Sequence, residues 1–89
     1  MDLPFEQLEK EGKLIRTFST DVDSEELMWH QDLKDRNVTV IEGNGWLFQM
    51  ENELPIKLED AKQIFIPKLA WHRVLKGNDR LIVEIEEFD

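Results

Sequence analysis

The chain has two histidines, and each one follows a tryptophan inside a similar short word of sequence. The first word, "LMWHQDLK", contains Trp29 and His30, and the second, "LAWHRVLK", contains Trp71 and His72. Imidazole rings in a small domain either bind a metal ion or serve as hydrogen-bonded structural groups. Which role applies depends on whether the elements that carry the two words bring the rings together.

Runs of apolar and polar residues, separated by turn residues, predict short β-strands along most of the chain. In the last run Leu81, Val83 and Ile85 alternate with Ile82 and Glu84, as in a strand with one buried face. Many short strands with frequent turns favour an all-β barrel or sandwich. The predicted strands are residues 13–20, 26–32, 38–41, 46–50, 63–67, 70–75 and 80–88.

The stretch "NVTVIEGNGWLFQM" carries the clearest turn signal. Its Gly-Asn-Gly sequence at 43–45 separates two β-rich runs, and these residues tolerate the positive φ of tight turns. We therefore expect a β-hairpin, with Trp46 and Phe48 on one face of its second strand. Those two rings either pack in the core or line a ligand pocket.

The start of the chain, "PFEQLEKEG", fits a short helix that ends at Gly12, and it fits a loose arm equally well. The acidic stretch "DVDSEE" predicts a loop. We divide this single small domain into an N-terminal arm with the first strand, residues 1–23, and a barrel, residues 24–89.

Composition excludes several classes of function. A net charge of −9 and a pI of about 4.6 repel phosphate backbones, so nucleic-acid binding is not expected. The absence of cysteine excludes disulfides and thiolate metal sites. No apolar run approaches the roughly 18 residues of a membrane span, and the acidic start lacks the core of a signal peptide. We expect a cytoplasmic protein without a membrane or nucleic-acid partner.

Four residues occur in an order that is typical of a known fold. His30 precedes a valine-rich run and Gly43, and His72 follows Pro67 by five residues. This order resembles the two motifs of the cupin superfamily, which are small β-barrels of the jelly-roll type. The resemblance covers residues 24–86 and implies that the motif strands lie side by side and point into one cavity.

The chain departs from those motifs at several positions. Asp32 replaces the second histidine of the first motif, and Arg36 or Asn37 replaces its glutamate. Ala61 and Leu69 replace two glycines of the second motif. These changes alter the ligand set that the resemblance implies.

The resemblance implies a mononuclear metal site at His30, Asp32 and His72. Residues i and i+2 of a strand share one face, so His30 and Asp32 can reach the same ion. Two histidines and one carboxylate suit Fe(II), and Mn, Co, Ni or Zn are also compatible. Arg36 would repel such an ion if it pointed inward, so it either pairs with a carboxylate or binds an anionic substrate.

We expect a small cupin that acts on or binds a small molecule, with Arg36, Trp46 and Phe48 as candidate ligand contacts. If it is an enzyme, it is a metal-dependent one of the dioxygenase or isomerase type. The alternative is a metal-free cupin that binds a ligand or a protein without catalysis. Because Trp29 and Trp71 would face away from the histidines, a partner subunit could cover them, and we expect a homodimer.

Overall fold

Eight β-strands arranged in two antiparallel sheets make up the computed structural model, which describes residues 5–21 and 27–89. The predicted all-β class is confirmed. The strands are β1 (Phe5–Lys10), β2 (Lys13–Phe18), β3 (Asp35–Glu42), β4 (Leu47–Met50), β5 (Ile56–Lys57), β6 (Gln63–Ile66), β7 (His72–Leu75) and β8 (Leu81–Phe88).

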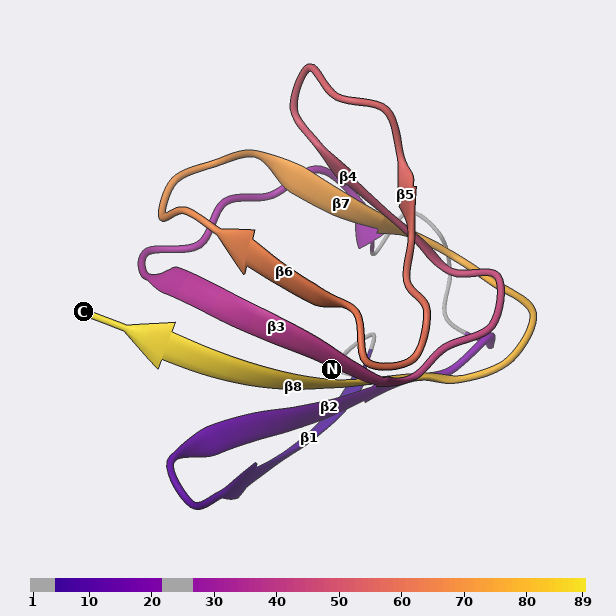
Figure 1. The fold of residues 1–89 in the computed structure, drawn as a ribbon, viewed down its shortest axis with the longest axis horizontal. Helices are drawn as coiled ribbons and strands as arrows, with labels where there is room; N and C mark the ends of the chain where they lie inside the picture. The colour runs from indigo at the N-terminus through magenta and orange to yellow at the C-terminus, as the bar shows by residue number, and fades with distance from the viewer. Residues whose placement is uncertain (1–4, 22–26) are drawn as a thin grey trace.

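The two sheets face each other (Figure 1). The larger sheet has the strand order β1-β2-β8-β3-β6, and the smaller one has the order β5-β4-β7. Several neighbours in a sheet are distant in sequence, as when β3 pairs with β8. The sheets are not joined into one continuous barrel, so the predicted barrel is an open sandwich of two sheets.

The core fills the space between the sheets and is built by strand alternation. On β8, Leu81, Val83 and Ile85 are each no more than 5% exposed, whereas the residues between them are partly exposed. Full burial of one such side chain contributes roughly 1.5–3 kcal/mol. The predicted facing of β8 is therefore confirmed, and this central strand fixes the inner surface of the larger sheet.

The possible N-terminal helix is wrong, because residues 5–10 form strand β1 in an antiparallel hairpin with β2. β2 in turn pairs with β8, which makes the N-terminal hairpin part of the larger sheet. No α-helix occurs in residues 5–21 and 27–89, and within these ranges no helix is long and apolar enough to cross a membrane. The predicted 21–26 loop lies almost wholly outside the described residues.

The predicted hairpin at 43–45 is also wrong, because β3 and β4 belong to different sheets. The turn carries the chain from one sheet to the other. Its Gly43 lies so close to the opposite segment that a Cβ atom there would stand 2.4 Å from the carbonyl oxygen of Leu58. Close backbone approach is a second reason for a turn to contain glycine, besides a positive φ.

Candidate metal centre

The two histidines lie directly opposite each other in an isolated antiparallel bridge. The amide of His30 donates to the carbonyl of His72 at 3.0 Å, and the amide of His72 donates back at 3.0 Å. The predicted strand at 26–32 is reduced to this single rung in its described part, residues 27–32. A further bond from the amide of Leu69 to the carbonyl of Asp32, 2.8 Å long, holds the two segments in register.

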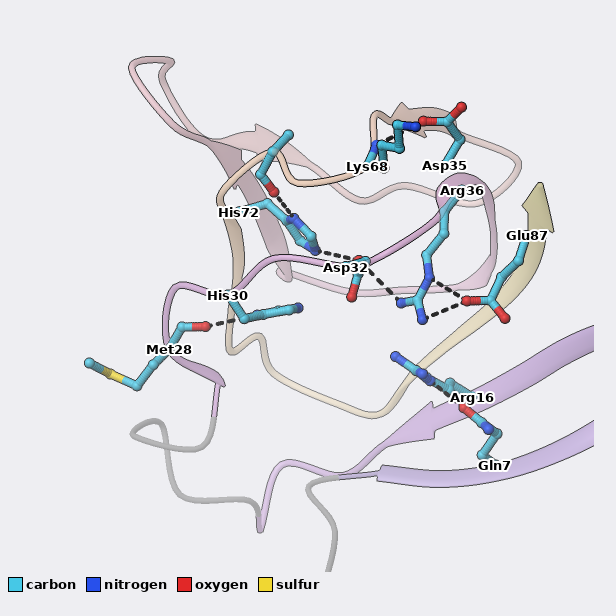
Figure 2. A network of polar contacts seen from close by, with 11 residues as sticks. Gln7, Arg16, Met28, His30, Asp32, Asp35, Arg36, Lys68, His72 and Glu87 are labelled. Carbon is cyan, nitrogen blue, oxygen red and sulfur yellow. Dashed lines mark hydrogen bonds and ion pairs between the residues drawn. The ribbon is translucent and has the colours of Figure 1, made fainter. Parts of the chain in front are cut away.

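Each imidazole is oriented by a backbone carbonyl two residues earlier in the chain (Figure 2). Nδ1 of His30 lies 2.9 Å from the oxygen of Met28, and Nδ1 of His72 lies 2.9 Å from the oxygen of Ala70. A carbonyl oxygen only accepts, so the proton of each neutral ring is assigned to Nδ1. Each Nε2 then carries a lone pair, as in histidines whose second nitrogen is fixed for metal binding.

Asp32 completes a group of three possible metal ligands. One ligand atom from each of His30, Asp32 and His72 lies within 4.8 Å of the others. Oδ2 of Asp32 is 3.2 Å from Nε2 of His72, and cis ligands of an ion with bonds of about 2.1 Å are separated by roughly 3.0–3.4 Å. These residues fit a divalent transition metal, and the predicted residues are brought together.

Oδ2 of Asp32 lies between the Arg36 guanidinium, at 3.3 Å, and the His72 ring, at 3.2 Å. Among the described residues, Oδ2 of Asp32 is the one fully enclosed side-chain polar atom that lacks a hydrogen bond of good geometry. It faces the lone pair of His72 Nε2, which is a second acceptor. A proton or a metal ion between them relieves this repulsion, because a buried polar group without a partner costs about 1–3 kcal/mol.

The charge of Asp32 is maintained by its neighbours. Burial raises the pKa of its carboxyl, but a hydrogen bond from the protonated form of the His72 ring and the positive charge of Arg36 outweigh burial, and the pKa lies below its ordinary value of 3.8. Asp32 is therefore an anion at neutral pH, which is the state that a metal ligand requires.

No protein-family model matches this sequence, and no curated protein matches it. Solved structures do match the fold. A structure of the DMSP lyases RdDddP and RnDddQII matches with a TM-score of 0.70 and 22% identity, over 82% of this chain and 35% of that one. A cupin-2 domain protein from Shewanella frigidimarina gives a TM-score of 0.64 and 18% identity, over 94% and 79% of the two chains.

This chain has the cupin fold. A third structure, Fe(II)-HppE with its substrate, matches with a TM-score of 0.68 and 11% identity, over 99% of this chain and 55% of that one. The chain spans about a third of the matched lyase chain and about half of HppE. Identities this low establish the fold, whereas the reactions belong to those proteins alone.

The backbone explains two departures from the cupin motifs. Ala61 and Leu69, which replace motif glycines, have φ values of 70° and 64°. The glycine conformation is thus retained without glycine, at a cost of roughly 1–2 kcal/mol for each L-residue. At Leu69 the conformation serves the site, because its amide donates to Asp32 and its carbonyl accepts from the side chain of Gln31 at 2.8 Å.

A cavity of about 340 Å³ adjoins the candidate metal centre. That size suits a small molecule. Its wall includes all three candidate ligands, His30, Asp32 and His72, together with Arg36 and Phe48 from the predicted ligand contacts. The third predicted contact, Trp46, is fully buried at 0% exposure in the core and is not part of this wall.

Arg36 is engaged by carboxylates on two sides. Its guanidinium lies 3.3 Å from Asp32 and 2.9 Å from Glu87, and the bond from Nε to the same Glu87 oxygen is 3.0 Å long. Sequence reasoning gave pairing with a carboxylate as one of two roles for Arg36. It missed Glu87, which stands opposite Arg36 in the β3–β8 register.

The tryptophan and histidine of the second word face opposite ways, as the alternation predicts, whereas Trp29 and His30 of the first word are both exposed and both line the cavity. His72 is 3% exposed, whereas Trp29 and Trp71 are 37% and 41% exposed. Leu27 does not follow the tryptophans outward, since it is buried in the core. Arg73 covers the Trp29 ring at 4.8 Å. Homodimerisation through this face stays a prediction.

Proposed function

We propose that this protein binds one divalent transition-metal ion through His30, Asp32 and His72 and acts on a small molecule in the adjoining cavity. The observation that carries this proposal is the set of unsatisfied acceptors. Both Nδ1 atoms are engaged by carbonyl oxygens, so both Nε2 lone pairs converge with an enclosed Asp32 oxygen that makes no hydrogen bond of good geometry, although Arg36 lies 3.3 Å from it.

The bound ion would act as a Lewis acid and leave coordination positions open for a substrate. The chain itself supplies orientation and shielding. The carbonyls of Met28 and Ala70 fix both rings, and Phe48 packs 5.7 Å from the His72 ring on the core side. Fe(II) is the favoured ion for two histidines and a carboxylate, followed by Mn, Co, Ni and Zn.

The similar structures support the same type of chemistry without assigning it. HppE is an Fe(II) protein that binds a substrate, and the lyases act on DMSP. We therefore favour a metal-dependent enzyme located in the cytoplasm. The absence of cysteine is compatible with this reducing compartment.

The alternative function is a metal-free cupin that binds a ligand without catalysis. One contact favours it: Arg36, 3.3 Å from Asp32, already neutralises that carboxylate and would repel a dication. Against it, Arg36 shares its charge with Glu87 at 2.9 Å, so the three residues together keep one net negative charge.

The decisive experiment is metal binding to chelator-treated protein. We expect one equivalent of Fe(II) under anaerobic conditions, and of Zn(II) as a diamagnetic substitute. Because the chain has two histidines, ring-nitrogen NMR reports on the site directly. Both Nε2 signals should move on zinc addition while both Nδ1 protons remain.

A matched pair of variants gives the control. Asp32→Asn should lose binding, and Glu59→Gln, which removes the same charge from an exposed position, should keep it. Less than one tenth of an equivalent of metal in the parent protein, or equal binding in both variants, would overturn the assignment.

A further inference from the structure

Arg16 occupies an inward position where the strand pattern calls for an apolar residue. On β2 it lies between Leu14 and Phe18, which both pack against the core. Its register partner on β8 is the buried Val83. The guanidinium therefore reaches the cavity that holds the metal centre, and Figure 2 shows it directed toward Arg36.

The Arg16 guanidinium is held in place, and no carboxylate of the described residues neutralises it. Its Cζ lies 4.1 Å above the centre of the Phe5 ring, and its Nε donates to Oε1 of Gln7. In residues 5–21 and 27–89 no carboxylate lies within ion-pair distance of it. Both contacts leave the two terminal nitrogens available, and these form the edge that binds oxyanions in a bidentate manner.

Arg36 shows what a neutralised arginine looks like in the same cavity. It contacts two carboxylates, Asp32 and Glu87, while Arg16 contacts a neutral amide and an aromatic ring. Burial lowers the pKa of Arg16, and the like charge of Arg36 lowers it further. An anion beside Arg16 would relieve both effects.

The net charge around the cavity also favours binding of an anion. Two arginines and two carboxylates, Asp32 and Glu87, cancel while the histidines are neutral. A divalent ion would leave the cavity with two positive charges, inside a chain of net charge −9. Such a cavity attracts a negatively charged group.

We propose that Arg16 binds the anionic group of a small carboxylate or phosphonate, whose remaining atoms extend toward the metal centre. This deepens the proposed function and rests on it for the second half of the ligand. The Arg16 contact itself does not require the metal. Its geometry is built by β1 and β2, outside the segments that carry the two histidines.

The experiment follows the side chain directly. The chain has four arginines, so NMR of their Nε–Hε groups gives four assignable signals. Propionate, methylphosphonate and neutral propionamide are titrated into metal-free and zinc-loaded protein. We expect the Arg16 signal to shift with one or both anions and not with the amide, and the preferred anion identifies the group.

Variants make the assignment specific. Arg16→Gln should weaken anion binding at least tenfold in both metal states, and Arg16→Lys should weaken it less. Arg80→Gln removes the same charge from an exposed ion pair with Glu42 and should bind as the parent does. Zinc binding by Arg16→Gln should remain stoichiometric.

Two results separate the inference from the proposed function. Equal anion affinity in Arg16→Gln and Arg80→Gln, with both variants folded by circular dichroism, would overturn the role of Arg16 and leave the metal site intact. If the parent protein does not bind zinc but still binds anions in a manner that depends on Arg16, the metal site is overturned and the anion site is supported.

Discussion

The two tryptophan–histidine words share a sequence pattern and a ring orientation, but they have different structural support. His72 is 3% exposed and lies on strand β7, which pairs with β4 in the smaller sheet. His30 lies on an irregular segment and is exposed, attached by one bridge to His72. Both rings are nevertheless oriented in the same way, because Nδ1 of each donates to the carbonyl oxygen two residues earlier.

The local backbone therefore fixes the tautomer of each histidine ring, whereas pairing within a sheet determines how rigidly the ring is held. A ring on a buried strand is fixed before a ligand arrives, whereas an exposed ring can move to complete the coordination. The ligand atoms spread over 4.8 Å and must close slightly around an ion. We therefore assign His72 as the anchoring ligand and His30 as the closing one.

Replacing each histidine in turn should have the largest effects on zinc affinity and should affect stability unequally. His72→Ala and His30→Ala should each lower zinc affinity at least 100-fold, because each removes one of three ligands. Metal-free His72→Ala should also lose about 2–4 kcal/mol of unfolding free energy, since it leaves a cavity and removes the hydrogen bond to the Ala70 carbonyl. Metal-free His30→Ala should lose less than about 1 kcal/mol.

Urea unfolding in the presence of a chelator measures these stabilities, and competition with a chromophoric chelator measures the affinities. Equal destabilisation by the two substitutions would contradict the distinction between an anchoring and a closing histidine.

Asp32 links the two words, and its protonation gives the second test. Because its folded pKa lies below 3.8, its charged form stabilises the fold above that pH, and this contribution is lost as the pH falls. The unfolding free energy of metal-free parent protein should therefore exceed that of Asp32→Asn near pH 6. The difference should shrink as the pH falls toward about 3.

Chemical denaturation of both proteins across this pH range measures the difference directly, and effects of other carboxylates cancel. A difference that stays constant or grows in acid would mean that the Asp32 carboxylate is not stabilised by its neighbours.

Much of the fold could be predicted because strand alternation is local. The strands at 13–18, 63–66, 72–75 and 81–88 were all predicted within a few residues. Strand β1 was not, because every residue after Phe5 is exposed, so it has no buried face, and its stability depends on pairing with β2. The turn at 43–45 was misassigned as a hairpin because a glycine-rich turn does not specify which strands pair.

Strand spacing placed His30 and Asp32 of the candidate metal centre on one face, but His72 was added through the resemblance, since residues far apart in sequence carry no local signal of contact. Arg16 was missed although a signal existed. It lies two residues from both Leu14 and Phe18, and strand period alone places all three on one face. A charged residue at an inward position is informative because burial makes it costly.

The smallest expected effect concerns the link that holds the exposed histidine segment to the strand segment. The side chain of Gln31 donates to the carbonyl of Leu69 at 2.8 Å, next to the backbone bond from Leu69 to Asp32. One such hydrogen bond contributes about 0.5–1.5 kcal/mol net. Gln31→Ala should therefore weaken zinc binding about two- to tenfold, by loosening the segment that carries His30.

Hydrogen exchange locates the loosening in this variant. The amides of His30 and His72, which donate to each other's carbonyls, should exchange faster in Gln31→Ala, and the amides of residues 73–75 in β7 should not change. Gln63→Ala, an exposed change on β6, should match the parent in both measurements. If Gln31→Ala leaves zinc affinity and His30 exchange unaltered, the single backbone bridge alone positions the closing histidine, and the side-chain link adds nothing to the site.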